Sequence, residues 1–121
     1  MTSMADPTLT PELALRYLDE LSTDIRAAVL LDRRSALAAS SGDADGERLR
    51  ELGLSLLERA DAAAPFDGRV AQVEASAPGG AVFAVRAEGW TIAVVTGRFA
   101  LSSLMFYDLR SVLSDLGARA A

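Results

Sequence analysis

The stretch from Ala81 to Thr96 constrains the fold most, because it predicts two paired strands that are apolar on both faces. Glu88-Gly89 lies between the two strands and is a two-residue hairpin signal. With that loop, one face of the pair carries large side chains such as Phe83, and the other carries mostly small ones such as Ala84. We therefore expect helices on both sides of this sheet, with the closer helix over the alanine face.

The other elements follow from apolar spacing and from capping signals. Thr10-Pro11-Glu12 offers an N-cap, a proline for the first helical position and an acid in the first turn. Pro65 ends the middle helix, since proline disfavours helical geometry both in itself and in the preceding residue. We expect helices at about residues 10–25, 45–63 and 102–116, and strands at about 28–31, 35–40, 70–76, 81–87 and 90–96.

These elements predict one α+β domain in the order α-β-β-α-β-β-β-α. A length of 121 residues, of which 50% are hydrophobic, is enough for a single core. We expect residues 1–9 to form a flexible N-terminal tail, residues 10–117 the domain, and residues 118–121 a flexible C-terminal tail.

The middle helix carries small residues within a leucine-rich face. At about 100° per residue, one arc holds Leu49, Leu52, Gly53, Leu56, Leu57, Ala60, Ala63 and Ala64. Glycine inside a helix costs roughly 0.5–1 kcal/mol relative to alanine, and close approach of this arc to the alanine face of the sheet would explain Gly53. Leu54 projects about 60° beyond the arc, where it is either a lone exposed leucine or a contact for a partner.

The chain lacks the usual side chains of protein catalysis. It has no histidine, no cysteine and no lysine, because all 12 of its basic residues are arginine. Without these residues there is no side chain that titrates near neutrality, no thiolate and no Schiff-base amine. A weak carboxylate hydrolase would need Asp32 and Glu74 in a geometry that the sequence does not suggest. We therefore expect a binding protein with no catalytic residues and no cofactor.

Charge and hydropathy exclude two classes of partner. A net charge of −5 disfavours nucleic acids and anionic membrane surfaces, since both need a positive footprint. No stretch reaches the roughly 18 apolar residues of a membrane helix. Residues 1–8 carry no basic residue before an apolar run, so we expect no secretory signal. Asp43 and Asp45 fall far short of a calcium loop, so we expect no metal site. The expected location is the cytoplasm.

Two arginines stand out in the first predicted hairpin. Arg33 and Arg34 lie at its tip, where they are either solvated side chains or contacts for a partner, including charge donors to a bound nucleotide. Trp90 pairs on the large-residue face of the sheet, so it is predicted to serve packing rather than ligand binding.

The chain resembles the roadblock family in three features: the order of its segments, the apolar strand ending in Leu30-Leu31-Asp32, and the small-residue strand from Ala36 to Ser40. This family includes a dynein light chain and bacterial regulators of Ras-like GTPases. The resemblance covers about residues 10–116. Family members commonly have a glycine at the end of the first hairpin turn, where this chain has Ser35. The resemblance implies one antiparallel five-stranded sheet with the middle helix on one face and the terminal helices on the other.

The resemblance also implies a homodimer that forms through the middle helix and the following strand. The predicted interface residues are Leu49, Leu52, Gly53, Leu54, Leu56, Leu57, Ala60, Val70 and Val73. The implied function is a non-catalytic regulator or scaffold that acts on a small Ras-like GTPase, and the sequence does not distinguish an activator from a scaffold. The alternative is a small-ligand sensory or adaptor domain without a GTPase partner, which would need a hollow with convergent polar groups.

Overall fold

The computed structural model describes residues 9–22, 24–43 and 45–120, with no account of the side chains of residues 119 and 120. Its elements, in chain order, are α1 (Pro11–Leu21), β1 (Ile25–Leu31), β2 (Leu37–Gly42), α2 (Gly46–Ala63), β3 (Gln72–Ala77), β4 (Gly80–Ala87), β5 (Trp90–Thr96) and α3 (Ser102–Ala120). The five strands form one antiparallel sheet in the order β2-β1-β5-β4-β3. The predicted α+β class and element order are confirmed.

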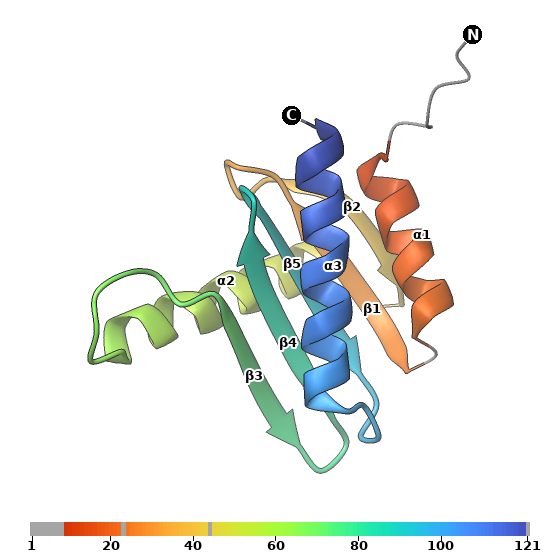
Figure 1. The fold of residues 1–121 in the computed structure, drawn as a ribbon. Coiled ribbons are helices and arrows are strands. Elements are labelled where there is room, and N and C mark those ends of the chain that lie inside the picture. The colour runs from red at the N-terminus through yellow and green to blue at the C-terminus, as the bar shows by residue number, and fades with distance from the viewer. Residues whose placement is uncertain (1–8, 23, 44, 121) are drawn as a thin grey trace, which may run out of the picture.

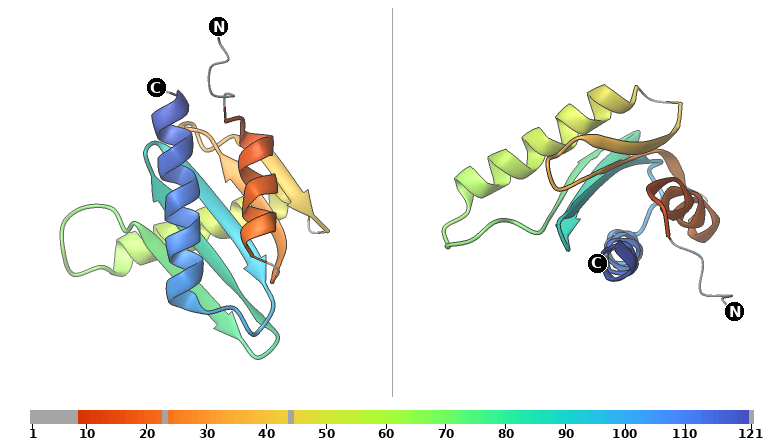
Figure 2. Two further views of the ribbon diagram at one scale, coloured as in Figure 1. Left: turned by 45° about the vertical axis from the view of Figure 1, so that its right-hand side comes forward. Right: turned by 90° about the horizontal axis from the view of Figure 1, so that it is seen from above.

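The helices cover the two faces of the sheet unequally. Figure 1 shows α1 and α3 side by side on one face, and α2 crosses the other face; Figure 2 gives the same three layers seen from above. Thr10 caps α1 by accepting a hydrogen bond from the Leu13 amide, as its sequence predicts. No helix in the described ranges is long and apolar enough to cross a membrane.

The β4–β5 hairpin has the predicted register. Phe83 lies opposite Val94 and Ala84 opposite Ala93. The two loop residues, Glu88 and Gly89, both adopt positive φ angles, 57° and 84°. Two consecutive residues of this kind make the type I′ turn, whose twist matches that of the strands it joins. The local signal in the sequence therefore set the register of the central sheet.

Two hydrophobic cores fill the spaces between the layers. Under α1 and α3 the core is built from large side chains, among them Leu30, Phe83 and Ile92, and the rings of Phe83 and Phe106 meet edge to face at 5.2 Å. Under α2 the core is thinner and includes Ala84 and Ala93. The predicted division into a large-residue face and a small-residue face is confirmed.

Several boundaries differ from the expectation; β2 and β3, for example, each begin two residues later than expected, at Leu37 and Gln72. α1 ends at Leu21, and Ile25 begins β1 instead of extending the helix. α3 passes through Gly117 and continues to Ala120, so the helix includes most of the predicted C-terminal tail. Most of the predicted N-terminal tail lies outside the described residues, but Leu9 packs against the core beneath α1 and α3. Apolar spacing does not reveal such ends, because packing decides where a helix stops.

Candidate dimer and partner surface

α2 presents Gly53 to the sheet at very short range. A Cβ atom added to Gly53 would lie 2.8 Å from Cβ of Ala93, so only glycine allows this approach. Leu49 and Leu57, one turn to either side of Gly53, are 4% and 1% exposed. These three residues were predicted in a dimer interface, but the structure places them in the core of their own chain.

One flank of α2 is fastened to the ends of the hairpins. Arg50 Nε donates a hydrogen bond to the Ser35 carbonyl at 2.6 Å, and Asp61 forms an ion pair with Arg86 at 2.6 Å. Leu54 lies on this flank, half-buried and packed against the core under α2. Leu54 was expected beyond the buried arc, as either a lone exposed leucine or a contact for a partner. The hydrogen bonds of Arg50 and Asp61 turn this flank toward the sheet, so Leu54 is not left exposed.

The opposite flank of α2 is open and exposes a leucine between charged residues. Leu52, predicted within the buried arc, is 43% exposed. It borders a hollow of about 420 Å³ that Arg48 and Val95 also line. Leu56, one turn further along the helix, is half-buried.

A row of apolar residues leads from this flank to the edge of the sheet. Val95 on β5 is opposite Val82 on β4, and Val82 is opposite Ala75 on β3, so all three face the same side as α2. With Leu52 they form what we call the apolar row. It links the open flank of α2 to β3 without passing through a charged residue.

β3 is an edge strand with little protection. It pairs with β4 alone, and its outer edge has no strand partner in the described ranges. The strand has no proline and one charged residue, Glu74, and its last four residues are exposed. Val73 is half-buried against the core under α2, and Val70 lies just before the strand. Natural proteins usually blunt a bare edge of this kind or pair it.

The first hairpin turn holds Arg33 and Arg34 away from the apolar row. Asp32 Oδ1 accepts hydrogen bonds from the amides of Arg34 and Ala36, which fixes the turn. Ser35 adopts a φ of 62°, the left-handed conformation that favours glycine. Both arginines are exposed, and Arg33 lies over the β4–β5 turn, where a Cβ on Gly89 would meet its side chain at 3.1 Å.

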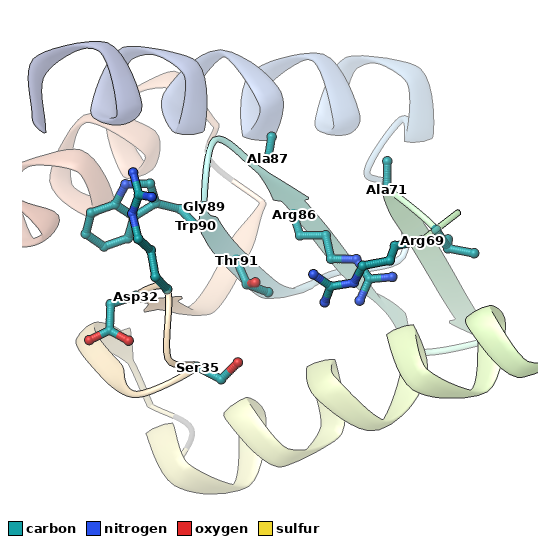
Figure 3. Close-up of a pocket in the computed structure, with 11 residues that line it drawn as sticks. Asp32, Ser35, Arg69, Ala71, Arg86, Ala87, Gly89, Trp90 and Thr91 are labelled. Atoms are coloured by element: carbon teal, nitrogen blue, oxygen red, sulfur yellow. The ribbon is translucent and has the colours of Figure 1, made fainter. Parts of the chain in front are cut away.

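Sequence reasoning missed a polar groove at these hairpin ends, which we call the arginine groove. It has a volume of about 450 Å³ and is lined by Asp32, Arg33, Arg69, Arg86, Trp90 and Thr91 among others (Figure 3). Trp90 packs against the large-residue core as predicted and also forms part of this lining. No motif marks the groove, because three separate segments contribute its residues.

Asp61 is the acid at the α2 side of this groove. A side-chain hydrogen bond from Arg86 chiefly lowers the pKa of Asp61 below its ordinary value of 3.8, and a hydrogen bond from the Val70 amide and the charge of Arg69 act in the same direction. Asp61 is therefore ionised at neutral pH and joins α2 to the segment before β3.

Solved structures share this arrangement of helices and strands. A roadblock/LC7 domain from Streptomyces avermitilis superposes with a TM-score of 0.76 at 18% identity, covering 88% of this chain and 94% of that domain. The gliding protein MglB from Thermus thermophilus gives 0.72 at 17% identity, covering 88% and 87%. Myxococcus xanthus MglB gives 0.72 at 10% identity, covering 98% and 92%. The chain has the roadblock/LC7 fold.

The likeness lies in the fold and not in the sequence. No protein-family model matches the chain, and no curated protein matches it. The five-stranded sheet of this roadblock/LC7 fold, with α2 alone on one face, confirms the arrangement that the resemblance implied. Another solved structure with this fold is MglB in a tetrameric arrangement.

Proposed function

We propose that the chain is a non-catalytic homodimeric regulator or scaffold of a small Ras-like GTPase. The apolar row carries this proposal. It runs from Leu52 across two strands to the bare edge of β3, so one partner can cover the helix flank and the edge together. A second copy of the chain offers the same two features, and twofold pairing brings each into contact with its equivalent.

The chemistry of the chain is consistent with regulation by contact. The described residues include no group of three or more His, Cys, Asp or Glu side chains that could hold a metal ion. The sequence has neither histidine nor cysteine to act as base or nucleophile. The roadblock/LC7 fold and the GTPase regulators that the resemblance implies support the choice of partner.

The test uses the Ras-like GTPases encoded in the same genome. Each is purified, loaded with GTP and mixed with this protein, and phosphate release and complex formation are measured in parallel. Faster phosphate release identifies an activator, and a stable complex without a change of rate identifies a scaffold. The absence of both effects with every such GTPase would contradict the proposal.

Leu52→Glu provides a matched variant for the same assay. A carboxylate in the apolar row disrupts pairing of the two copies, so any effect that needs the dimer is lost. Leu13→Glu is the control, because Leu13 lies on α1 at the other face of the sheet and is 38% exposed, close to the 43% of Leu52. The control should behave as the parent protein does.

A further inference from the structure

The arginine groove lies apart from the apolar row, on the other flank of α2. Its walls come from the β1–β2 turn, the β4–β5 hairpin and the residues before β3. Figure 3 shows the guanidinium groups of Arg69 and Arg86 directed into the groove above α2, with Thr91 in its floor and Trp90 at the other end. A volume of about 450 Å³ is within the range of small-molecule sites.

The groove is locally positive in a chain whose net charge is −5. Arg33, Arg69 and Arg86 bring three guanidinium groups, against the carboxylates of Asp32 and Asp61. Both acids are already engaged within the fold, Asp32 with two amides of its turn and Asp61 with Arg86 and the Val70 amide. One positive charge therefore remains uncompensated at the groove.

Several donors of these arginines have no acceptor. In the described part of the chain, neither Arg33 nor Arg69 forms an ion pair or a hydrogen bond through its side chain. Arg86 Nε is buried and has no hydrogen-bond partner there. A buried donor without an acceptor costs free energy, and like charges that share a cavity repel one another.

An oxyanion beside Arg69 and Arg86 would reduce both costs. The planar fork of arginine matches carboxylate and phosphate oxygens and binds them through paired, charge-assisted hydrogen bonds. Trp90 at the far end of the groove offers an apolar surface for the remainder of an organic molecule. The Thr91 hydroxyl adds a donor and acceptor in the floor.

We propose that the arginine groove binds a small organic oxyanion, a carboxylate or a phosphate ester, whose acidic group lies beside Arg69 and Arg86 and whose remainder extends toward Arg33 and Trp90. The site makes the domain a ligand sensor as well as a contact surface, and it does not depend on the GTPase assignment. Because Val70 and Ala71 also line the groove and precede β3, a bound anion would act directly on the segment next to the proposed dimer edge.

The single tryptophan of the chain reports on the site, because Trp90 lines the groove. Its fluorescence is followed at low salt while inorganic phosphate, citrate or AMP is added. The proposal predicts a saturable change with at least one probe at or below about 1 mM. AMP should bind more tightly than phosphate if its ring contacts Trp90.

Charge-matched variants separate this site from general charge effects. Arg69→Gln should weaken binding roughly tenfold or more, since it removes charge-assisted hydrogen bonds to the acidic group. Arg33→Gln should weaken binding less, since it removes only a positive charge at the Trp90 end of the groove. Arg16→Gln removes the same charge from the exposed side of α1, on the other face of the sheet, and should leave the dissociation constant unchanged. Arg69→Lys retains the charge without the fork and should give an intermediate loss.

Two results would overturn the proposal. One is the absence of any saturable change up to about 10 mM of every probe. The other is a loss of binding in Arg16→Gln equal to that in Arg69→Gln, which would show attraction to overall charge only. Circular dichroism of each variant checks that the fold is intact. Arg33 and Arg69 are exposed, so their replacement leaves the core closed.

Discussion

Gly53→Ala tests the contact on which the position of α2 depends. The added methyl carbon would lie 2.8 Å from Cβ of Ala93 and 4.0 Å from Cβ of Ala84. Carbon atoms in good contact are about 3.5–4.0 Å apart, so α2 and the sheet would have to separate by roughly 1 Å. The hydrogen bonds that Arg50 and Asp61 make to the hairpin ends resist this movement.

The magnitude follows from two opposing effects. Overpacking a well-packed interior costs about 1–3 kcal/mol, whereas alanine gains roughly 0.5–1 kcal/mol over glycine within a helix. We therefore expect Gly53→Ala to lower the free energy of unfolding by about 0.5–2 kcal/mol. Urea unfolding followed by circular dichroism at one fixed protein concentration measures this difference.

Two further variants make the result specific to the contact. Gly79 has no atom within 4 Å of its added Cβ, so Gly79→Ala should be neutral or stabilise by up to about 1 kcal/mol. Combining Gly53→Ala with Ala93→Gly should restore part of the loss, a coupling of about 1 kcal/mol. A Gly53→Ala protein as stable as the parent, or more stable, would refute the close-contact explanation.

Three other predictions concern single residues. Ser35→Gly should raise the free energy of unfolding by about 0.5–1 kcal/mol in urea unfolding. The left-handed conformation at φ 62° costs serine free energy in the folded state, and this cost exceeds the larger loss of chain entropy that glycine suffers on folding. The pKa of Asp61 is lowered in the folded protein, so its pairing with Arg86 stabilises the fold above about pH 4, and this stabilisation is lost as the pH falls below 3.8. In Asp61→Asn the free energy of unfolding should therefore fall less steeply as the solution is acidified. Leu30→Ala should cost about 2–5 kcal/mol in urea unfolding, since this side chain is fully buried under α1 and α3.

Local signals in the sequence were sufficient for the central hairpin and its two faces, whereas the five-stranded sheet and the placement of the terminal helices were implied by the family resemblance. The loop residues Glu88 and Gly89 set the register of β4 and β5, and that register separated a large-residue face from a small-residue face. Gly53 then identified the helix that covers the small face. Each of these inferences concerns residues close in sequence or opposite one another in a hairpin.

The rotation of α2 could not be predicted in the same way. Viewed down the helix axis, hydrophobicity predicted a buried arc with Leu52 at one border and Leu57 at the other. The arc that contacts the sheet has Leu49 at one border and Leu54 at the other, with Leu57 between them. The buried face is therefore rotated by about 60° around the helix axis. The shift brings Arg50 and Asp61 toward the hairpin ends, where their partners lie. These hydrogen bonds join residues far apart in sequence, so helical periodicity carries no signal of them.

The arginine groove escaped prediction for a related reason. Arg33, Arg69 and Arg86 belong to three segments that the fold brings together, and each alone is an ordinary polar residue. Arg33 and Arg34 were expected to be either solvated or contacts for a partner; both are exposed, and Arg33 lies beside Gly89 and Trp90. An acidic chain can therefore contain a local positive site that its net charge hides.

Sedimentation equilibrium of the parent protein, Leu52→Glu and Leu13→Glu tests the proposed pairing most directly. The apolar row and the bare edge of β3 predict a parent protein with twice the mass of one chain at micromolar concentration. Leu52→Glu should be a folded monomer and Leu13→Glu a dimer like the parent, although the two leucines are similarly exposed. A parent protein that stays monomeric at high concentration, or a Leu52→Glu variant as dimeric as the parent, would contradict the account.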